Sequence, residues 1–168
     1  MNENQIDSIL KQIDELIRRR LFSDALAVCN DALSRASDSD KHRLNGWKAN
    51  IYWSAGNADK ALEHIKHARA ENPNWAGHAC YSALWQLELG NYRESYKDAQ
   101  ELFELEKNRG SVAFIDLARK IAAYSLILEG KLIEAINWAE AIEDDKPSWL
   151  AGRLITKTGL LKEARRKT

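Results

Sequence analysis

The sequence lacks an excess of charge of either sign. Among its 168 residues, lysine and arginine together number 25, and aspartate and glutamate also number 25. Proteins that bind nucleic acid through its phosphates normally carry a surplus of positive charge. The balanced charge therefore argues against nucleic acid as a partner.

Cysteines and long apolar runs are also scarce. The two cysteines, Cys29 and Cys80, lie inside helical patterns, which suits small buried side chains in a reducing compartment. The opening MNENQIDSIL has acids and amides where a signal peptide needs a basic start and an apolar run. No stretch approaches the roughly 18 uninterrupted apolar residues of a membrane span. We therefore expect a cytoplasmic protein with no membrane partner and no disulfide.

Motifs that carry catalysis are missing too. The sequence has no phosphate-binding loop, no glycine-rich nucleotide fingerprint and no paired-carboxylate motif. His64 and His67 share one helical face, and His78 is close to Cys80, but these spacings match no recognised set of metal ligands. We therefore expect no enzyme, no cofactor and no metal site.

The sequence does contain a recurring helical pattern. Apolar residues at Ile6, Ile9, Leu10, Ile13 and Ile17 predict an amphipathic opening helix. Similar patterns predict helices over 25–36, 44–55, 58–70, 76–89, 92–106, 112–129, 132–142 and 149–157, with a short last segment after 159. Glycine, proline or capping residues separate these segments, and none of them predicts a strand. The fold class that follows is all-α.

Four glycines mark a recurring helix hairpin: Gly56, Gly90, Gly130 and Gly159. Seven residues before them stand Ala49, Ala83, Ala123 and Gly152, and five residues after them stand Ala61, Ser95, Ala135 and Ala164. All eight are small, as is needed where the two helices of a hairpin approach most closely. Ala25 and Ala32 indicate an earlier, degenerate unit in which Arg20 takes the place of the glycine.

These spacings predict a single repeat domain over 1–168. It would be a right-handed α-solenoid of about four to five stacked helix-turn-helix hairpins. The expected units are a degenerate N-terminal hairpin over 1–36, central hairpins over 42–73, 76–107 and 112–143, and a trimmed C-terminal hairpin over 148–168.

The pattern resembles the tetratricopeptide repeat (TPR), whose units carry a small residue, a turn glycine, a second small residue and often a closing proline. The match is clearest through Ala49, Tyr52, Gly56, Ala61, Ala68 and Pro73. It differs from the family at Asn45 and Lys48, where large apolar residues are usual, and the next two units lack the closing proline. The resemblance implies a module that binds a protein or peptide in a groove formed by the first helices of successive units.

Carried across in register, the resemblance places eight residues of interest in that groove: Arg43, Asn50, Trp53, Leu84, Leu87, Lys120, Tyr124 and Ile127. This mixed and partly apolar lining suits an apolar or aromatic peptide, or a folded surface. It does not suit an acidic tail, because only Asn50 and Lys120 match the cationic clamp of some family members.

Six tryptophans are present, and the sequence predicts different roles for them. Trp47, Trp85 and Trp138 are interpreted as core filling between helices. The register places Trp53 on the groove side, where tryptophan either anchors an interface or packs. We expect Trp75 and Trp149 to begin first helices and to staple adjacent units.

The predicted function is a non-catalytic protein-binding module that works as an adaptor or chaperone. An alternative is an inhibitor or immunity-type protein that masks another protein's active surface, and its interface would be an acidic patch: Glu140, Glu143, Asp144 and Asp145. The preferred interpretation of these four acids is a solvated helix end, and a docking patch for a basic partner is the alternative. An RNA-binding helical repeat is disfavoured by the balanced charge, and self-association is left open.

Overall fold

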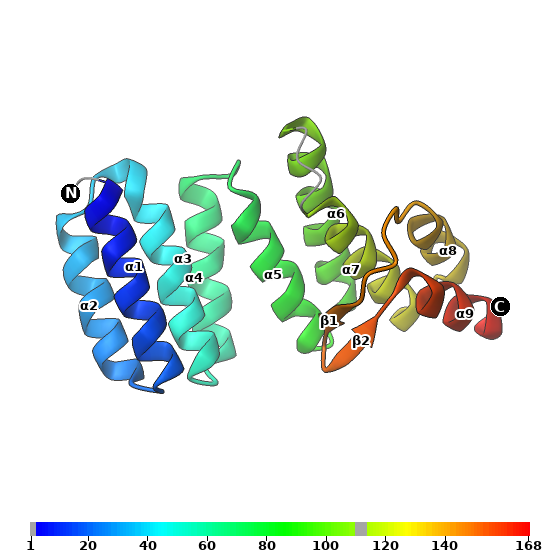
Figure 1. Ribbon diagram of the computed structural model, residues 1–168, viewed down its shortest axis with the longest axis horizontal. Coiled ribbons are helices and arrows are strands. Elements are labelled where there is room, and N and C mark those ends of the chain that lie inside the picture. Colours follow the sequence, from blue (N-terminus) through cyan, green and yellow to red (C-terminus); the bar gives the residue numbers. More distant parts are fainter. Residues whose placement is uncertain (1–2, 110–113) are drawn as a thin grey trace. The chain divides into compact units, whose positions relative to one another are not determined.

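The computed structural model describes residues 3–109 and 114–168, which form nine helices and one two-stranded hairpin (Figure 1). Packing divides the chain into two compact units, Met1–Asn74 and Trp75–Thr168. The boundary falls at the predicted break of Asn72, Pro73 and Asn74. The predicted break at Gly110 and the predicted helix start at Val112 lie outside the described residues.

The first unit consists of two helix pairs. They are α1 (Glu3–Arg18) with α2 (Phe22–Arg35), and α3 (Asp38–Ser54) with α4 (Ala58–Glu71). The predicted apolar face of α1 is buried through Ile6, Leu10 and Ile13, which pack with Cys29 of α2 and Ile51 of α3. The predicted opening hairpin therefore exists, and α3 joins its core.

Two buried polar residues of α3 form hydrogen bonds with residues at the C-terminal end of α4. Buried Asn45 donates from Nδ2 to Glu71 Oε2 at 2.8 Å. Buried His42 lies with Nε2 at 3.1 Å from Asn72 Nδ2. The hydrogen bond of Asn45 explains how the unit tolerates a polar side chain where the family has an apolar one, because buried polar groups are stable only when they are paired.

The second unit begins with two further helix pairs. They are α5 (Ala76–Glu88) with α6 (Tyr92–Arg109), and α7 (Ile115–Leu128) with α8 (Leu132–Glu140). The strands β1 (Ser148–Leu150) and β2 (Arg153–Ile155) follow, and α9 (Lys157–Lys167) ends the unit. Trp138 packs edge-on against Phe103 with ring centroids 5.3 Å apart, as expected of core filling between helices.

Each helix pair turns through one residue with left-handed backbone geometry. The φ angle is +80° at Gly56, Gly90 and Gly130, and +61° at Arg20. After each of these residues, the next backbone N–H bonds to a carbonyl five residues earlier, as from Asn57 to Tyr52 at 2.9 Å. This arrangement ends a helix with its last carbonyls satisfied. Arg20 thus occupies the turn position that the sequence assigned to it.

The small residues around these turns are buried in close contact, as predicted. Ala49, Ala61, Ala83, Ser95, Ala123 and Ala135 are all fully buried. Ser95 Oγ donates to the carbonyl of Ala83 at 2.8 Å and accepts from Ser125 Oγ at 3.0 Å. The hydroxyl of Ser95 therefore links α6 to both α5 and α7.

The C-terminal hairpin differs from the prediction. Residues 149–157 do not form a helix, because Ala151 and Gly152 have φ angles of +45° and +73° and reverse the chain within two residues. Two left-handed residues in succession form a β-turn that joins antiparallel strands. The resulting hairpin pairs Trp149 with Leu154, and Leu150 with Arg153.

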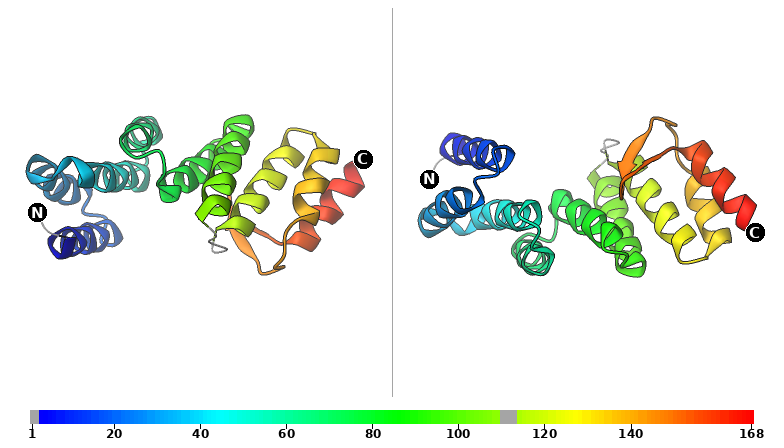
Figure 2. Two further views of the ribbon diagram at one scale, coloured as in Figure 1. Left: turned by 90° about the horizontal axis from the view of Figure 1, so that it is seen from above. Right: turned by 90° about the horizontal axis from the view of Figure 1, so that it is seen from below.

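The fourth turn glycine was also assigned wrongly. Gly159 lies in the first turn of α9, where its N–H donates to the Oγ1 of the N-cap residue Thr156 at 3.0 Å. Ala164 is buried, but α9 packs as a single helix beside α8 and α7 (Figure 2). The region 148–168 is therefore a strand hairpin plus one helix.

Candidate functional site

The three predicted groove residues of the first unit lie on α3. Arg43 Nη2 donates to Asp7 Oδ1 at 2.5 Å, so its guanidinium ties α3 to α1. Asn50 and Trp53 are half-buried. Arg43 is therefore committed to an ion pair within the unit, whereas Asn50 and Trp53 keep some exposed surface.

The five predicted groove residues of the second unit lie on α5 and α7, and four of them are inside the protein. Leu87, Lys120, Tyr124 and Ile127 are only 2–3% exposed. Leu84 is half-buried. The expectation that these four line an open groove is wrong for this structure, because a side chain without exposed surface cannot touch a partner.

The chain's own strand hairpin contributes to this burial. Leu150 of β1 and Ile155 of β2 are buried in the same apolar cluster as Leu87, Tyr124 and Ile127. Arg153 donates from Nη1 to the hydroxyl of Tyr124 at 3.1 Å, and its guanidinium lies 5.6 Å from the centre of the tyrosine ring. The inward face of the hairpin thus occupies the part of α7 where the family resemblance placed a bound peptide.

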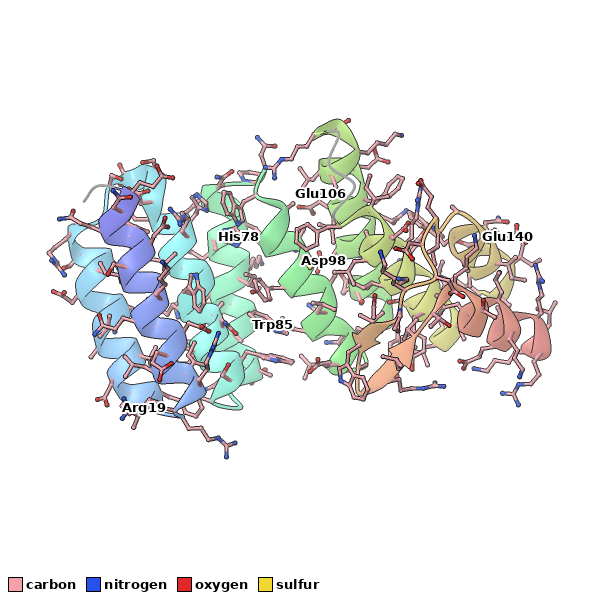
Figure 3. All side chains as sticks on the ribbon, in the orientation of Figure 1. Arg19, His78, Trp85, Asp98, Glu106 and Glu140 are labelled. Carbon is pink, nitrogen blue, oxygen red and sulfur yellow. The ribbon has the colours of Figure 1, made fainter. Side chains whose placement is uncertain are left out.

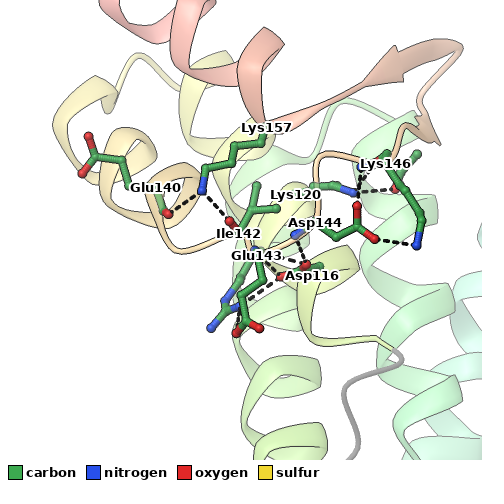
Figure 4. A network of polar contacts seen from close by, with 10 residues as sticks. Asp116, Lys120, Glu140, Ile142, Glu143, Asp144, Lys146 and Lys157 are labelled. Atoms are coloured by element: carbon green, nitrogen blue, oxygen red, sulfur yellow. Dashed lines mark hydrogen bonds and ion pairs between the residues drawn. The ribbon is translucent and has the colours of Figure 1, made fainter.

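Side chains from α7 and α9 hold the segment that leads into the hairpin (Figure 4). Lys120 Nζ donates to the carbonyl of Lys146 at 2.5 Å and lies 3.4 Å from Ser148 Oγ. Lys157 Nζ donates to the carbonyls of Glu140 at 3.0 Å and Ile142 at 2.5 Å, at the end of α8. Lys120, predicted to recognise a partner, therefore binds the chain itself.

Asp116 is the acceptor at the centre of this network. Its carboxylate accepts from the backbone N–H groups of Glu143 at 3.2 Å and Asp144 at 2.8 Å, and from Arg119 Nη1 at 2.9 Å. Burial raises the pKa of Asp116, but these backbone hydrogen bonds and the Arg119 guanidinium lower it by more, so its pKa lies below the usual range. The charged form of Asp116 is therefore the one that fixes the segment after α8.

The four residues of the predicted acidic patch all have partners inside the chain. Glu140, labelled in Figure 3, accepts from Arg165 at 3.0 Å, and Glu143 accepts from Arg119 at 3.2 Å. Asp144 pairs with Lys146 at 2.7 Å. Asp145 accepts from the Thr158 hydroxyl at 2.6 Å and from its N–H at 3.0 Å.

These pairings change what the patch offers to a partner. The hydrogen bond from Lys146 lowers the pKa of Asp144, and the hydrogen bonds from Thr158 lower the pKa of Asp145. Both carboxylates are stabilised as anions by groups of this chain, and three of the four acids already face a cation. The acidic residues therefore serve first to order the segment between α8 and α9.

The outward face of the hairpin, formed by Trp149 and Leu154, was not predicted from the sequence. Trp149 and Leu154 are directly opposite each other across the two strands, and they are 70% and 62% exposed. The predicted helix implied that Trp149 packs between adjacent repeat units. In the structure, Trp149 lies on a strand and faces outward instead. The available signal was the alternation of Trp149-Leu150 and Leu154-Ile155 around a glycine-containing turn, a pattern of strands with one buried face.

Neither thiol is arranged for chemistry. Cys29 and Cys80 are free and buried, and burial raises the pKa of each to about 11, above any physiological pH. Within the part of the chain that the structure describes, no three His, Cys, Asp or Glu side chains come together as a metal site. No helix among the described residues is long and apolar enough to cross a membrane.

Comparisons with known proteins identify the fold. No family model matches the sequence, and no curated protein matches it. Two crystal structures of nearly identical TPR-like repeats from a Podosopora anserina protein described as a kinesin light chain each have a TM-score of 0.74 at 13% identity. The first structure, a substituted variant, aligns over 99% of this chain and 88% of its own length. The second aligns over 97% of this chain and 86% of its own length.

A third structure, the Sgt2 TPR domain from Aspergillus fumigatus, aligns with a TM-score of 0.59 and 20% identity over 84% of this chain and 87% of its own. At these identities the likeness concerns the fold. Together with the four repeated turns and their buried small residues, it confirms the predicted all-α solenoid of TPR-like hairpins. The chain has the fold of a TPR-like helical repeat protein.

Proposed function

We propose that this protein is a non-catalytic module that binds another protein or a peptide, as an adaptor or chaperone. The observation that carries the proposal is the outward face of the strand hairpin, formed by Trp149 and Leu154. A tryptophan that is 70% exposed beside a leucine that is 62% exposed is costly to leave in water. Tryptophan is also the residue most enriched among the dominant contacts of protein interfaces.

The hairpin suits an interface because its inward face is fixed to the core of the second unit. Leu150 and Ile155 anchor it in the core, Arg153 donates to the Tyr124 hydroxyl, and Lys120 Nζ lies 3.4 Å from Ser148 Oγ. A rigid aromatic side chain loses little conformational entropy when a partner covers it. Stacked helical repeats commonly present such surfaces to proteins or peptides, and the chain's TPR-like neighbours share that architecture. A cytoplasmic location belongs to this proposal as well.

The predicted groove contributes to the proposal only through Asn50 and Trp53 of α3 and the half-buried Leu84 of α5. The alternative role as an inhibitor that uses the acidic patch has less support, because Glu140, Glu143 and Asp144 are already paired with cations. The proposal therefore places the main contact on Trp149 and treats Trp53 as a second candidate.

The test begins with capture of partners from the source organism's lysate on the immobilised protein, with the Trp149→Ala variant run in parallel. Each candidate is then purified and titrated by calorimetry. Trp149→Ala should weaken binding by about 2 kcal/mol, the scale of an aromatic hot spot. Ile133→Ala is the matched control, since Ile133 of α8 is 73% exposed and should change the affinity less than about twofold.

Trp53→Ala and the charge reversal of Glu143 and Asp144 complete the series. If Trp149→Ala binds like the parent protein while Trp53→Ala is weakened, the groove of α3 is the interface and the hairpin proposal is wrong. If only the charge reversal abolishes binding, the acidic patch is the interface. A partner enzyme that loses activity in that complex would then establish the inhibitor role.

A further inference from the structure

The strand hairpin has one edge with no neighbouring strand or helix pair beside it. The hairpin is a two-stranded sheet, and β1 is the strand that lies beside α5 and α7 (Figure 1). β2 therefore forms the edge on the other side. Gly152, Arg153 and Leu154 are all exposed along this edge. An exposed edge strand is a template on which a further strand can pair.

The register of the hairpin shows which backbone groups this edge offers. Opposite residues in antiparallel strands alternate between pairs that share hydrogen bonds and pairs that do not. The two-residue turn closes on Leu150 and Arg153, so this pair is hydrogen-bonded. The next pair, Trp149 and Leu154, is not, and the N–H and C=O of Leu154 consequently point away from β1. Neither group bonds to backbone elsewhere in the part of the chain that the structure describes.

The two faces of the hairpin differ in chemistry at this edge. Side chains of a strand that pairs with β2 alternate between the two faces of the sheet. On the outward face they continue the exposed apolar pair of Trp149 and Leu154. On the inward face they lie beside Arg153, whose side chain is 56% exposed. A segment that fits both faces has apolar residues at every second position and residues that complement Arg153 between them.

The charge around the edge decides which polar residues fit there. β2 and α9 together contain six lysines and arginines but one acid, Glu163. Glu163 already faces two cations, Arg153 at 3.6 Å and Lys167 at 3.0 Å. Lys162 and Arg166 are exposed on α9, and neither has an ion pair among the described residues. This surplus of positive charge attracts a segment with carboxylates and repels a basic one.

We propose that the partner binds as an additional strand on β2, through an extended segment in which apolar and acidic residues alternate. This inference rests on the proposed partner-binding function and specifies the class of partner. The N–H and C=O of Leu154 pair with the backbone of the segment, its apolar side chains contact Trp149 and Leu154, and its carboxylates face Arg153. In such strand addition, backbone pairing gives affinity and the alternate side chains give specificity.

The test is nuclear magnetic resonance of the ¹⁵N-labelled protein with synthetic peptides of one length. The probe is acetyl-Glu-Val-Glu-Val-Glu-Val-Glu-amide, and its control carries lysine at every glutamate position. The glutamate peptide should shift the Leu154 amide proton downfield and slow its exchange with solvent. It should also shift the Trp149 indole signal saturably, with a dissociation constant on the order of 1 mM, a weak affinity expected of a short flexible peptide. The lysine peptide should bind at least about tenfold more weakly.

Backbone methylation separates strand pairing from side-chain contact. Two further versions of the glutamate peptide carry N-methyl groups on the valines or on the glutamates, which remove those N–H donors and keep every side chain. If the valine opposite Leu154 pairs antiparallel, it exchanges both hydrogen bonds itself, and valine methylation should weaken binding at least about tenfold. If the strands are parallel, the flanking glutamates supply these bonds, and glutamate methylation should have that effect.

A pair of alanine variants locates the binding surface. Leu154→Ala should weaken binding of the glutamate peptide about two- to tenfold, because an apolar contact is lost. Ile133→Ala removes an equally exposed apolar side chain from α8 and should leave the affinity unchanged. Equal effects of the two variants would contradict binding at β2.

Other outcomes would also overturn the proposal. They are a Leu154 amide that no peptide changes while the protein remains folded, equal binding of the glutamate and lysine peptides, and full binding by both methylated versions. Phosphatidylserine vesicles that shift the Trp149 and Leu154 signals when the glutamate peptide does not would assign the surface to lipid instead.

The inference and the proposed function can fail separately. A partner captured from lysate that requires Trp149 but leaves exchange of the Leu154 amide unchanged would contradict strand addition and support the proposed function. A glutamate peptide that protects the Leu154 amide, when no captured protein requires Trp149, would support strand addition and contradict the proposed role of Trp149.

Discussion

Tyr124 makes its polar contact through the phenolic oxygen, which accepts a hydrogen bond from Arg153 at 3.1 Å. The ring itself is buried among the apolar residues of the second unit. The same side chain is therefore part of the core and part of the attachment of the strand hairpin. A substitution of Tyr124 should therefore act mainly on the stability of the protein and only indirectly on its affinity for a partner.

Two variants of Tyr124 separate these contributions. Tyr124→Phe removes only the hydroxyl and should destabilise the protein by about 0.5–1.5 kcal/mol. Tyr124→Ala also leaves a cavity and should cost about 3–5 kcal/mol. Urea unfolding followed by circular dichroism measures both values. A change below about 0.5 kcal/mol for Tyr124→Ala would show that the ring is exposed, as the groove prediction required.

Asp116 makes the stability of the folded protein depend on pH. Its pKa in the folded protein lies below the value of roughly 3.9 of an unfolded chain. The stabilisation from this group is therefore complete above the unfolded pKa and is lost as the pH falls through the folded pKa.

Asp116→Asn should consequently destabilise the protein by about 1–3 kcal/mol at pH 7, because the backbone N–H groups of Glu143 and Asp144 lose a charged acceptor. The difference from the parent should shrink as the pH falls below roughly 4. Urea midpoints measured between pH 7 and pH 3 test this. A difference that stays constant over the whole range would contradict the role of the charged carboxylate.

At the scale of helices and strands, the helix pairs depend on small residues where two backbones meet. Ala61, the fourth residue of α4, is fully buried, whereas its neighbour Lys60 is exposed. Ala61→Leu should destabilise the protein by about 1–3 kcal/mol through overpacking. Lys60→Leu should cost less than about 1 kcal/mol, mainly through its contact with the Tyr52 ring. Thermal melting compares the two, and equal losses would mean that the faces of α4 are assigned wrongly.

At the strand hairpin, the sign of a change in stability distinguishes the observed turn from the predicted helix. Gly152 has a φ of +73°, so Gly152→Ala should destabilise the protein by about 1–2 kcal/mol. In the helix that the sequence pattern predicted here, the same change would stabilise by about 0.5–1 kcal/mol. Ala151→Gly is the matched control and should be neutral or stabilising, because Ala151 has a φ of +45°. Denaturant unfolding of both variants gives the sign of each change in the free energy of unfolding.

The helix pairs could be predicted from the sequence because their signals are local. A turn glycine and two small residues at fixed spacing report one close contact, and even Arg20 could be placed by this register. The hairpin could not be predicted in the same way. Trp149, Leu150, Leu154 and Ile155 are equally compatible with a helix face or with short strands, and the choice depends on Leu150 and Ile155 reaching the core of the second unit.

For the whole molecule, the family resemblance predicted the fold better than the site. The register of the first helices placed Leu87, Lys120, Tyr124 and Ile127 in an open groove, but it could not show that residues 146–155 contact α7 there. Whether a groove is open depends on contacts between residues about 30 positions apart in the chain, such as Tyr124 and Arg153. Such contacts leave no periodic signal in a single sequence.

The position of the hairpin on α7 is the central claim, and nuclear Overhauser effects measure it most directly. In the ¹³C-labelled protein, the ring protons of Tyr124 should show strong effects to the side-chain methylene protons of Arg153, while the Trp149 indole should show none to Tyr124. A one-residue slip of the strands would exchange their two faces. Effects between the Trp149 indole and Tyr124, with none to Arg153, would show that the tryptophan faces the core and would contradict the account.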